Sequence, residues 1–84
     1  MTEAALREMG RRLQRLEDIE AIRRLKVRMQ REGEAAFASA REHEAGGRTE
    51  EAIAAYERAL QLLPVDHASA QAARDRLAAL RHGA

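Results

Sequence analysis

The stretch GEAAFASAREHEAGGRTEEAIAAYERALQLLPVD, residues 33–66, decides the fold of this 84-residue chain. Its middle holds Gly46-Gly47, a pair suited to the left-handed backbone that ends one helix and turns the chain toward another. On both sides of the pair, small and apolar residues recur at helical spacing. The stretch therefore predicts two helices joined by a tight turn.

The helix after the glycine pair carries its own start and stop signals. Thr49 is the predicted N-cap, Glu50 and Glu51 suit the positive end of the helix, and Pro64 ends it. One predicted face holds the apolar residues Ala52, Ile53, Tyr56, Ala59, Leu60 and Leu63.

A third helix is predicted after the proline. Asp66 is its expected N-cap, Arg81 and His82 suit its negative end, and Gly83 stops it. Its apolar face is narrow and consists of Ala70, Ala73, Leu77 and Leu80. Such a polar last helix is expected to close the fold.

Upstream of the glycine pair, the pattern indicates one long helix from Glu3 to about Ala45, roughly 60 Å at 1.5 Å per residue. Gly33 leaves two interpretations open. It can end or kink the helix, or it can let another helix approach closely where the side chain is missing.

The first part of this long helix has two apolar faces. The early residues are spaced 3, 4 and 3 apart, as in a coiled-coil seam, and the stripe then moves around the helix. Two short helices cannot cover both faces, so we expect a homodimer or higher oligomer held by this helix. The predicted interface residues are Leu6, Met9, Leu13, Leu16, Ile19, Ile22, Leu25 and Met29.

The composition favours an all-α fold and excludes large enzyme folds. Of the 38 apolar residues, 19 are alanine, and the chain has one proline and no cysteine. A core this thin points again to self-association, because so short a chain buries little apolar surface. The net charge of +1 is unlike that of a dedicated nucleic-acid binder. The basic segment from Arg7 to Arg31 nevertheless leaves a nucleic-acid-associated or regulatory factor as the alternative function.

Residues 33–66 resemble a single tetratricopeptide repeat, most closely in the second half, where an alanine, an aromatic, a small residue and a proline follow in the order of that family. Where the family has Trp, Leu-Gly and Tyr, this chain has Ala36, Ser39-Ala40 and His43. The residues that the resemblance assigns to repeat packing are Ala40, Ala52, Tyr56, Ala59, Leu60 and Pro64. The resemblance also implies a peptide groove lined by Glu34, Phe37, Arg41 and Glu44.

No catalytic, cofactor or metal site is expected. His43, His67 and His82 lack the spacing of metal ligands, and Ser39 and Ser69 lie in alanine-rich helices without a base. The N-terminus has neither the apolar run of a signal peptide nor that of a membrane span, so a cytoplasmic location is the default.

The sequence thus predicts one domain: an oligomerisation helix over residues 1–32, a repeat-like hairpin over 33–66 and a closing helix over 67–84. We expect a non-enzymatic scaffold or adaptor for protein association.

Overall fold

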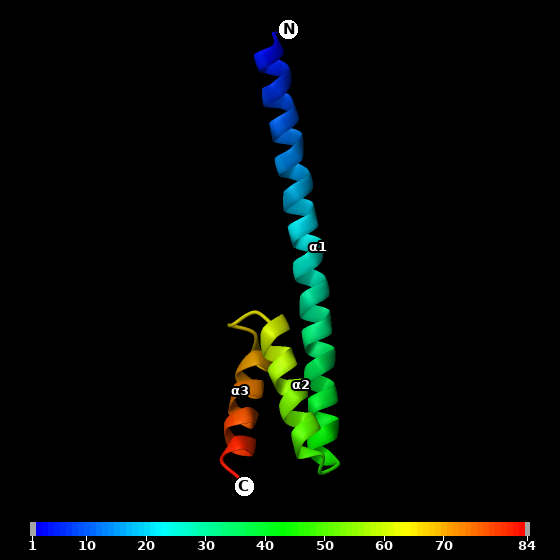
Figure 1. The fold of residues 1–84 in the computed structure, drawn as a ribbon, viewed down its shortest axis with the longest axis vertical. Helices are drawn as coiled ribbons and strands as arrows, with labels where there is room; N and C mark the ends of the chain where they lie inside the picture. The colour runs from blue at the N-terminus through cyan, green and yellow to red at the C-terminus, as the bar shows by residue number, and fades with distance from the viewer. Residues whose placement is uncertain (1, 84) are drawn as a thin grey trace.

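The chain is helical in a computed structural model, which describes residues 2–83, and the side chains of all of these except residues 8 and 10–17. Three helices and no strand occur in that part of the chain: α1 (Glu3–Ala45), α2 (Thr49–Leu62) and α3 (Ala68–Arg81). Figure 1 shows α2 packed along the C-terminal end of α1 and α3 packed along α2, each antiparallel to the helix before it. The N-terminal half of α1 projects away from them, so the molecule measures 70 × 18 × 17 Å.

Helix α1 is continuous, as the long-helix prediction required. The Thr2 hydroxyl caps its start by accepting a hydrogen bond from the Ala5 N–H at 3.3 Å. The helix then runs through Gly33 without a break to Ala45. The alternative that Gly33 ends the helix is therefore wrong.

The turn between α1 and α2 is built from hydrogen bonds that satisfy the last carbonyls of α1. The Arg48 N–H donates to the His43 carbonyl at 2.9 Å, and the Gly47 N–H donates to the Glu44 carbonyl at 3.1 Å. This pattern is a Schellman motif, which requires a left-handed residue, and Gly47 supplies it with φ of +76°. Because the turn closes on Arg48, that residue is the N-cap of α2, and the predicted cap Thr49 is the first helical residue instead.

The start of α3 also differs from the prediction. His67, not Asp66, is the N-cap, and its ring Nδ1 accepts a hydrogen bond from the Ser69 N–H at 3.0 Å. An imidazole nitrogen can replace the usual carboxylate or hydroxyl oxygen because it also has a lone pair. Sequence reasoning did not consider a histidine for this position.

The core lies between the three helices and consists mainly of small side chains. Two groups of buried residues meet there, and Phe37 and Leu60 pack against both groups. Tyr56 is the largest fully buried side chain among the described residues. The members of the two groups are Ala40, Ala52, Tyr56, Ala73 and Leu77, and Ala36, Ala59, Leu63 and Ala70.

Gly33 lies where the end of α2 closely approaches α1. A Cβ atom at this position would meet Leu63 Cγ at 2.7 Å and Leu62 Cβ at 3.1 Å, both shorter than a normal contact. The glycine is therefore explained by helix packing. Of the two interpretations of Gly33, close approach of another helix is the correct one.

We predict that Gly33→Ala destabilises the protein even though alanine is the better helix former. Overpacking should cost about 1 to 3 kcal/mol, more than the roughly 1 kcal/mol that helix propensity returns. Chemical denaturation monitored by circular dichroism measures the difference. Ala35→Gly, at an exposed position of the same helix, is the control for propensity alone. A Gly33→Ala protein more stable than the original would contradict the close approach.

Candidate functional site

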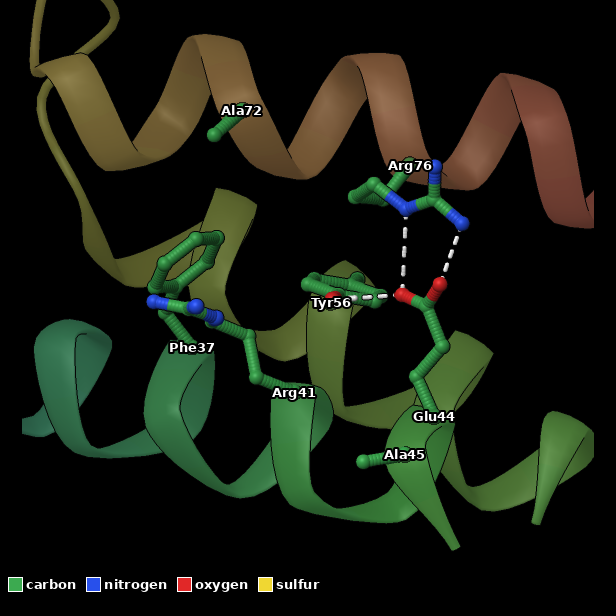
Figure 2. A pocket seen from close by; sticks show the side chains of 7 residues that line it. All are labelled: Phe37, Arg41, Glu44, Ala45, Tyr56, Ala72 and Arg76. Carbon is green, nitrogen blue, oxygen red and sulfur yellow. Dashed lines mark hydrogen bonds and ion pairs between the residues drawn. The ribbon is translucent and has the colours of Figure 1, made fainter. Parts of the chain in front are cut away.

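A groove of about 500 Å³ lies between α1 and α3 and is the candidate site. Helix α2 passes beneath it and contributes Tyr56 to the floor. Figure 2 shows the walls: Phe37, Arg41 and Glu44 rise from α1, and Arg76 reaches down from α3. The two remaining lining residues, Ala45 and Ala72, are small and leave the space between the helices open.

A polar network crosses the groove at one end. The Tyr56 hydroxyl donates to Glu44 Oε1 at 2.8 Å, and the Arg76 Nε donates to the same oxygen at 3.1 Å. A second Arg76 nitrogen bonds to the other Glu44 oxygen, which makes the pair bidentate (Figure 2). Since Glu44, Tyr56 and Arg76 come from α1, α2 and α3, this network joins all three helices at one carboxylate.

The network moves the pKa values of Glu44 and Tyr56 farther from neutral pH. Hydrogen bonds from Arg76, and then from Tyr56, hold the pKa of the Glu44 carboxyl below its ordinary value. Burial, followed by the bond to Glu44, raises the pKa of the Tyr56 hydroxyl above its ordinary value. The carboxylate therefore stays ionised and the phenol stays protonated, so the network serves to hold the groove in shape.

The other end of the groove is apolar. The rings of Phe37 and Tyr56 meet edge to face, with centroids 5.7 Å apart and an interplanar angle of 60°. Phe37 is half-buried, so part of its surface remains available to a bound molecule.

Arg41 starts on α1 between Phe37 and Glu44 and extends toward Phe37 (Figure 2), and it has no hydrogen bond or salt bridge with any residue that the structure describes. The charge of Glu44 is compensated by Arg76, so Arg41 leaves the groove with a net positive charge. An anionic group placed there would meet a guanidinium that is already oriented toward the groove.

Three of the four predicted groove residues, Phe37, Arg41 and Glu44, line this groove. Glu34 does not, because its carboxylate accepts from Gln30 at 3.2 Å and faces His67 Nε2 at 3.2 Å. The bond from Gln30, and then the one from His67, lowers the pKa of Glu34. Since the Nδ1 atom of His67 accepts a bond from the backbone, its proton is assigned to Nε2, facing the carboxylate.

Four groove residues were not predicted as such from the sequence: Ala45, Ala72 and Arg76, and Tyr56, which was assigned to repeat packing. Ala72 and Arg76 lie on α3 beside its buried residues Ala73 and Leu77. A charged residue bordering an apolar stripe was the available signal, but it does not reveal which helix the arginine faces. That depends on how α3 is rotated against α1.

The residues assigned to repeat packing occupy the interior with two exceptions. Ala40, Ala52, Tyr56 and Ala59 are buried, Leu60 is half-buried, and Pro64 is exposed. Pro64 instead borders a hollow beside Met29 at the end of α2.

The predicted oligomer residues lie along the projecting part of α1. Leu6, Met9, Ile19, Ile22 and Leu25 are exposed and Met29 is half-buried. Leu13 and Leu16 fall outside the residues whose side chains the structure describes.

The histidines lie apart from one another. His43 accepts a hydrogen bond from Arg48 at 2.9 Å, His67 caps α3, and His82 is the C-cap of α3. No group of three metal-ligating side chains occurs among the described residues. In the same part of the chain, no helix has both the length and the apolar character needed to cross a membrane.

Comparison of the chain with protein-family models, with curated proteins and with solved structures finds no match. The interpretation of the groove therefore depends on its own geometry and chemistry.

We predict that Tyr56→Ala costs about 3 to 5 kcal/mol of stability, because it removes the largest ring of the core. Tyr56→Phe keeps the ring and loses only the bond to Glu44, and it should cost about 1 kcal/mol. Thermal or denaturant unfolding of the two variants separates packing from hydrogen bonding. Equal losses in both would show that the ring contributes little.

Acid should weaken the contact between α1 and α3. Because folding lowers the pKa of Glu44, its stabilising contribution is complete above the ordinary value of 4.5 and is lost as the pH falls below it. We expect Glu44→Gln to show a smaller loss of melting temperature on acidification than the original chain. Glu42→Gln, at an exposed position of the same helix, is the matched control. Identical acid profiles for the original chain and Glu44→Gln would contradict this role.

Proposed function

We propose that this protein is a non-enzymatic interaction module that binds a peptide segment of a partner in the groove between α1 and α3 and joins to further copies through the projecting part of α1. The observation that carries the proposal is the groove itself. It combines an apolar end at Phe37, a fixed polar network at Glu44 and the Arg41 guanidinium, which no described residue pairs with.

The resemblance to a tetratricopeptide repeat supports this function. In that family the inner face of the first helix of a repeat lines a peptide groove, and Phe37, Arg41 and Glu44 occupy the matching positions here. The C-terminal part of α1 corresponds to that first helix and α2 to the second. Helix α3 then forms the opposite wall, where a following repeat would place its own first helix.

The chemistry of the groove favours an acidic peptide with an apolar neighbour. A carboxylate of the ligand would pair with Arg41, whose guanidinium presents several N–H donors in one plane. An apolar side chain next to it would cover the exposed part of Phe37. Such a ligand leaves the bonds of Glu44 to Tyr56 and Arg76 intact.

A basic patch supports a second candidate function, association with a nucleic acid. Arg23, Arg24, Arg28 and Arg31 surround Val27 in a shallow hollow on α1. One of them, Arg24, is paired with Glu20 at 3.6 Å. No aromatic side chain lines this hollow to stack on bases, which makes the groove the better supported site.

Selection from a random peptide library on the full chain tests the groove. We expect enriched peptides to pair an acidic residue with an apolar one, and Arg41→Glu to weaken their binding by about tenfold or more. Arg58→Glu makes the same charge change at an exposed position on α2 and should leave binding within about twofold. No enrichment, or an equal loss in both variants, would refute the groove.

Salt-dependent retention on heparin distinguishes the second candidate. Two results together would favour the basic patch. Retention would disappear when Arg23 and Arg28 are changed to glutamine, and it would be unchanged in Arg41→Glu.

A further inference from the structure

The projecting part of α1 gives the chain far more surface than its mass requires. The accessible surface is 6578 Å², against about 5,000 Å² for a compact protein of this mass. The radius of gyration is 19.9 Å, against about 12 Å for a compact chain of this length. The excess of about 1,600 Å² exceeds the roughly 800 Å² that each partner buries in a standard interface.

Exposed apolar side chains account for part of this surface. Six apolar residues of α1 each keep between 45% and 56% of their surface exposed: Leu6, Met9, Ile19, Ile22, Leu25 and Val27. Along an α-helix, Ile22 and Leu25 fall on one face and Leu6, Met9 and Val27 on the opposite one, with Ile19 between them. We call these the inner and the outer face.

The inner face is the side of α1 that α2 covers farther along. Ile22 and Leu25 lie about four and three turns before the buried Ala36, and therefore on the same side of the helix. A partner helix on this face meets the end of α2 beside Met29 and Pro64. It also finds polar residues, Asp18 and Arg15, before Ile22.

The outer face points the opposite way. Leu6 precedes the buried Gly33 by 27 positions, and Met9 precedes the buried Ala36 by the same number. Because 27 positions make about seven and a half turns, Leu6 and Met9 lie on the side of α1 opposite these buried residues. No described helix packs on this side of α1. In sequence, Leu13 and Leu16 continue the face at the 3, 4, 3 spacing of a coiled-coil seam.

Charge determines how two outer faces can pair. Val27 follows Met9 by 18 positions, which is about five turns, so the basic patch of Arg23, Arg24, Arg28 and Arg31 surrounds the continuation of the outer face. Two parallel helices would bring this patch against its own copy, and like charges at that distance repel. Two antiparallel helices that overlap only near their N-termini keep the patches apart.

We infer that a second copy of this chain covers the outer face, with the two α1 helices antiparallel and Leu6 and Met9 at the shared seam. This inference deepens the self-association in the proposed function, and it does not depend on the groove. The register that sets these apolar positions against one another places Leu6 opposite position 16 of the other copy and Met9 opposite position 13, so the overlap spans residues 3–19. Phe37, the groove residue nearest the overlap, is 18 positions away, about 27 Å, so both grooves stay open at opposite ends of the assembly.

Small-angle scattering and sedimentation of the full chain across a dilution series test the inference. The expected mass is twice that of one chain. The expected longest dimension is about 115 Å, because two rods of 70 Å overlap by roughly 24 Å. A parallel pair would measure only about 70 Å.

Two variants with the same chemical change identify the face. Met9→Asp places a charge at the seam and should give the mass of a single chain, whereas Ile22→Asp, equally exposed on the inner face, should leave the dimer intact. Both lie outside the core, so the helical content of the hairpin should be unchanged.

Four results would overturn the inference: a single-chain mass at every concentration, a dimer of about 70 Å, a Met9→Asp protein that remains dimeric, or an Ile22→Asp protein that dissociates. A single-chain mass together with binding to heparin or to anionic vesicles would assign the arm to an anionic partner instead. Peptide binding in the groove is measured separately through Arg41→Glu, so either proposal can fail alone.

Discussion

Close packing of small residues between α1 and α2 is the constraint on which the rest of this structure depends. Gly33, Ala36 and Ala40 on α1 face Ala52, Ala59 and Leu63 on α2, so the two backbones approach closely. Small side chains bury little surface individually, and the interface therefore needs close contact along its whole length to be stable. Tyr56 adds the largest fully buried side chain of the described residues, in the space between the helices that small residues leave.

The position of α3 follows from this hairpin and from polar contacts to α1. Alanine and leucine residues hold α3 in the core, and two polar contacts join it to α1: His67 Nε2 facing Glu34 at 3.2 Å, and the pair of Arg76 with Glu44. The same carboxylate accepts the Tyr56 hydroxyl, so the buried ring and the surface ion pair stabilise each other. The groove exists because this contact lies at one end of the space between α1 and α3, and small residues leave the remainder open.

The chain combines two regions with different physical properties. Beyond the hairpin, α1 is a single helix whose apolar residues are uncovered within the chain. Four of its arginines, Arg23, Arg24, Arg28 and Arg31, surround Val27 on one side. An isolated helix of this length gains little stability without a packed face. The projecting part of α1 exposes apolar surface and lacks stability of its own. Both properties favour a protein partner for it.

Local sequence signals alone determined the helices and most of their limits. The helical period located α1 from Glu3 to Ala45, and the glycine pair located the turn, because these features depend on neighbouring residues. Phe37, Arg41 and Glu44 were predicted as groove residues from their positions in a repeat-like pattern, and all three line the groove. The caps were less predictable, since His67 and Arg48 replaced the expected Asp66 and Thr49 through contacts specific to their turns.

Only the tertiary structure decided the meaning of Gly33, the partner of Glu44 and the opposite wall of the groove. Gly33 had two possible roles until Leu63 was found against it. Arg76 is 32 positions from Glu44, and nothing local connects them. Pairing across such a separation depends on how α3 is rotated and placed by its alanine face, and that geometry is a property of three packed helices rather than of any one segment.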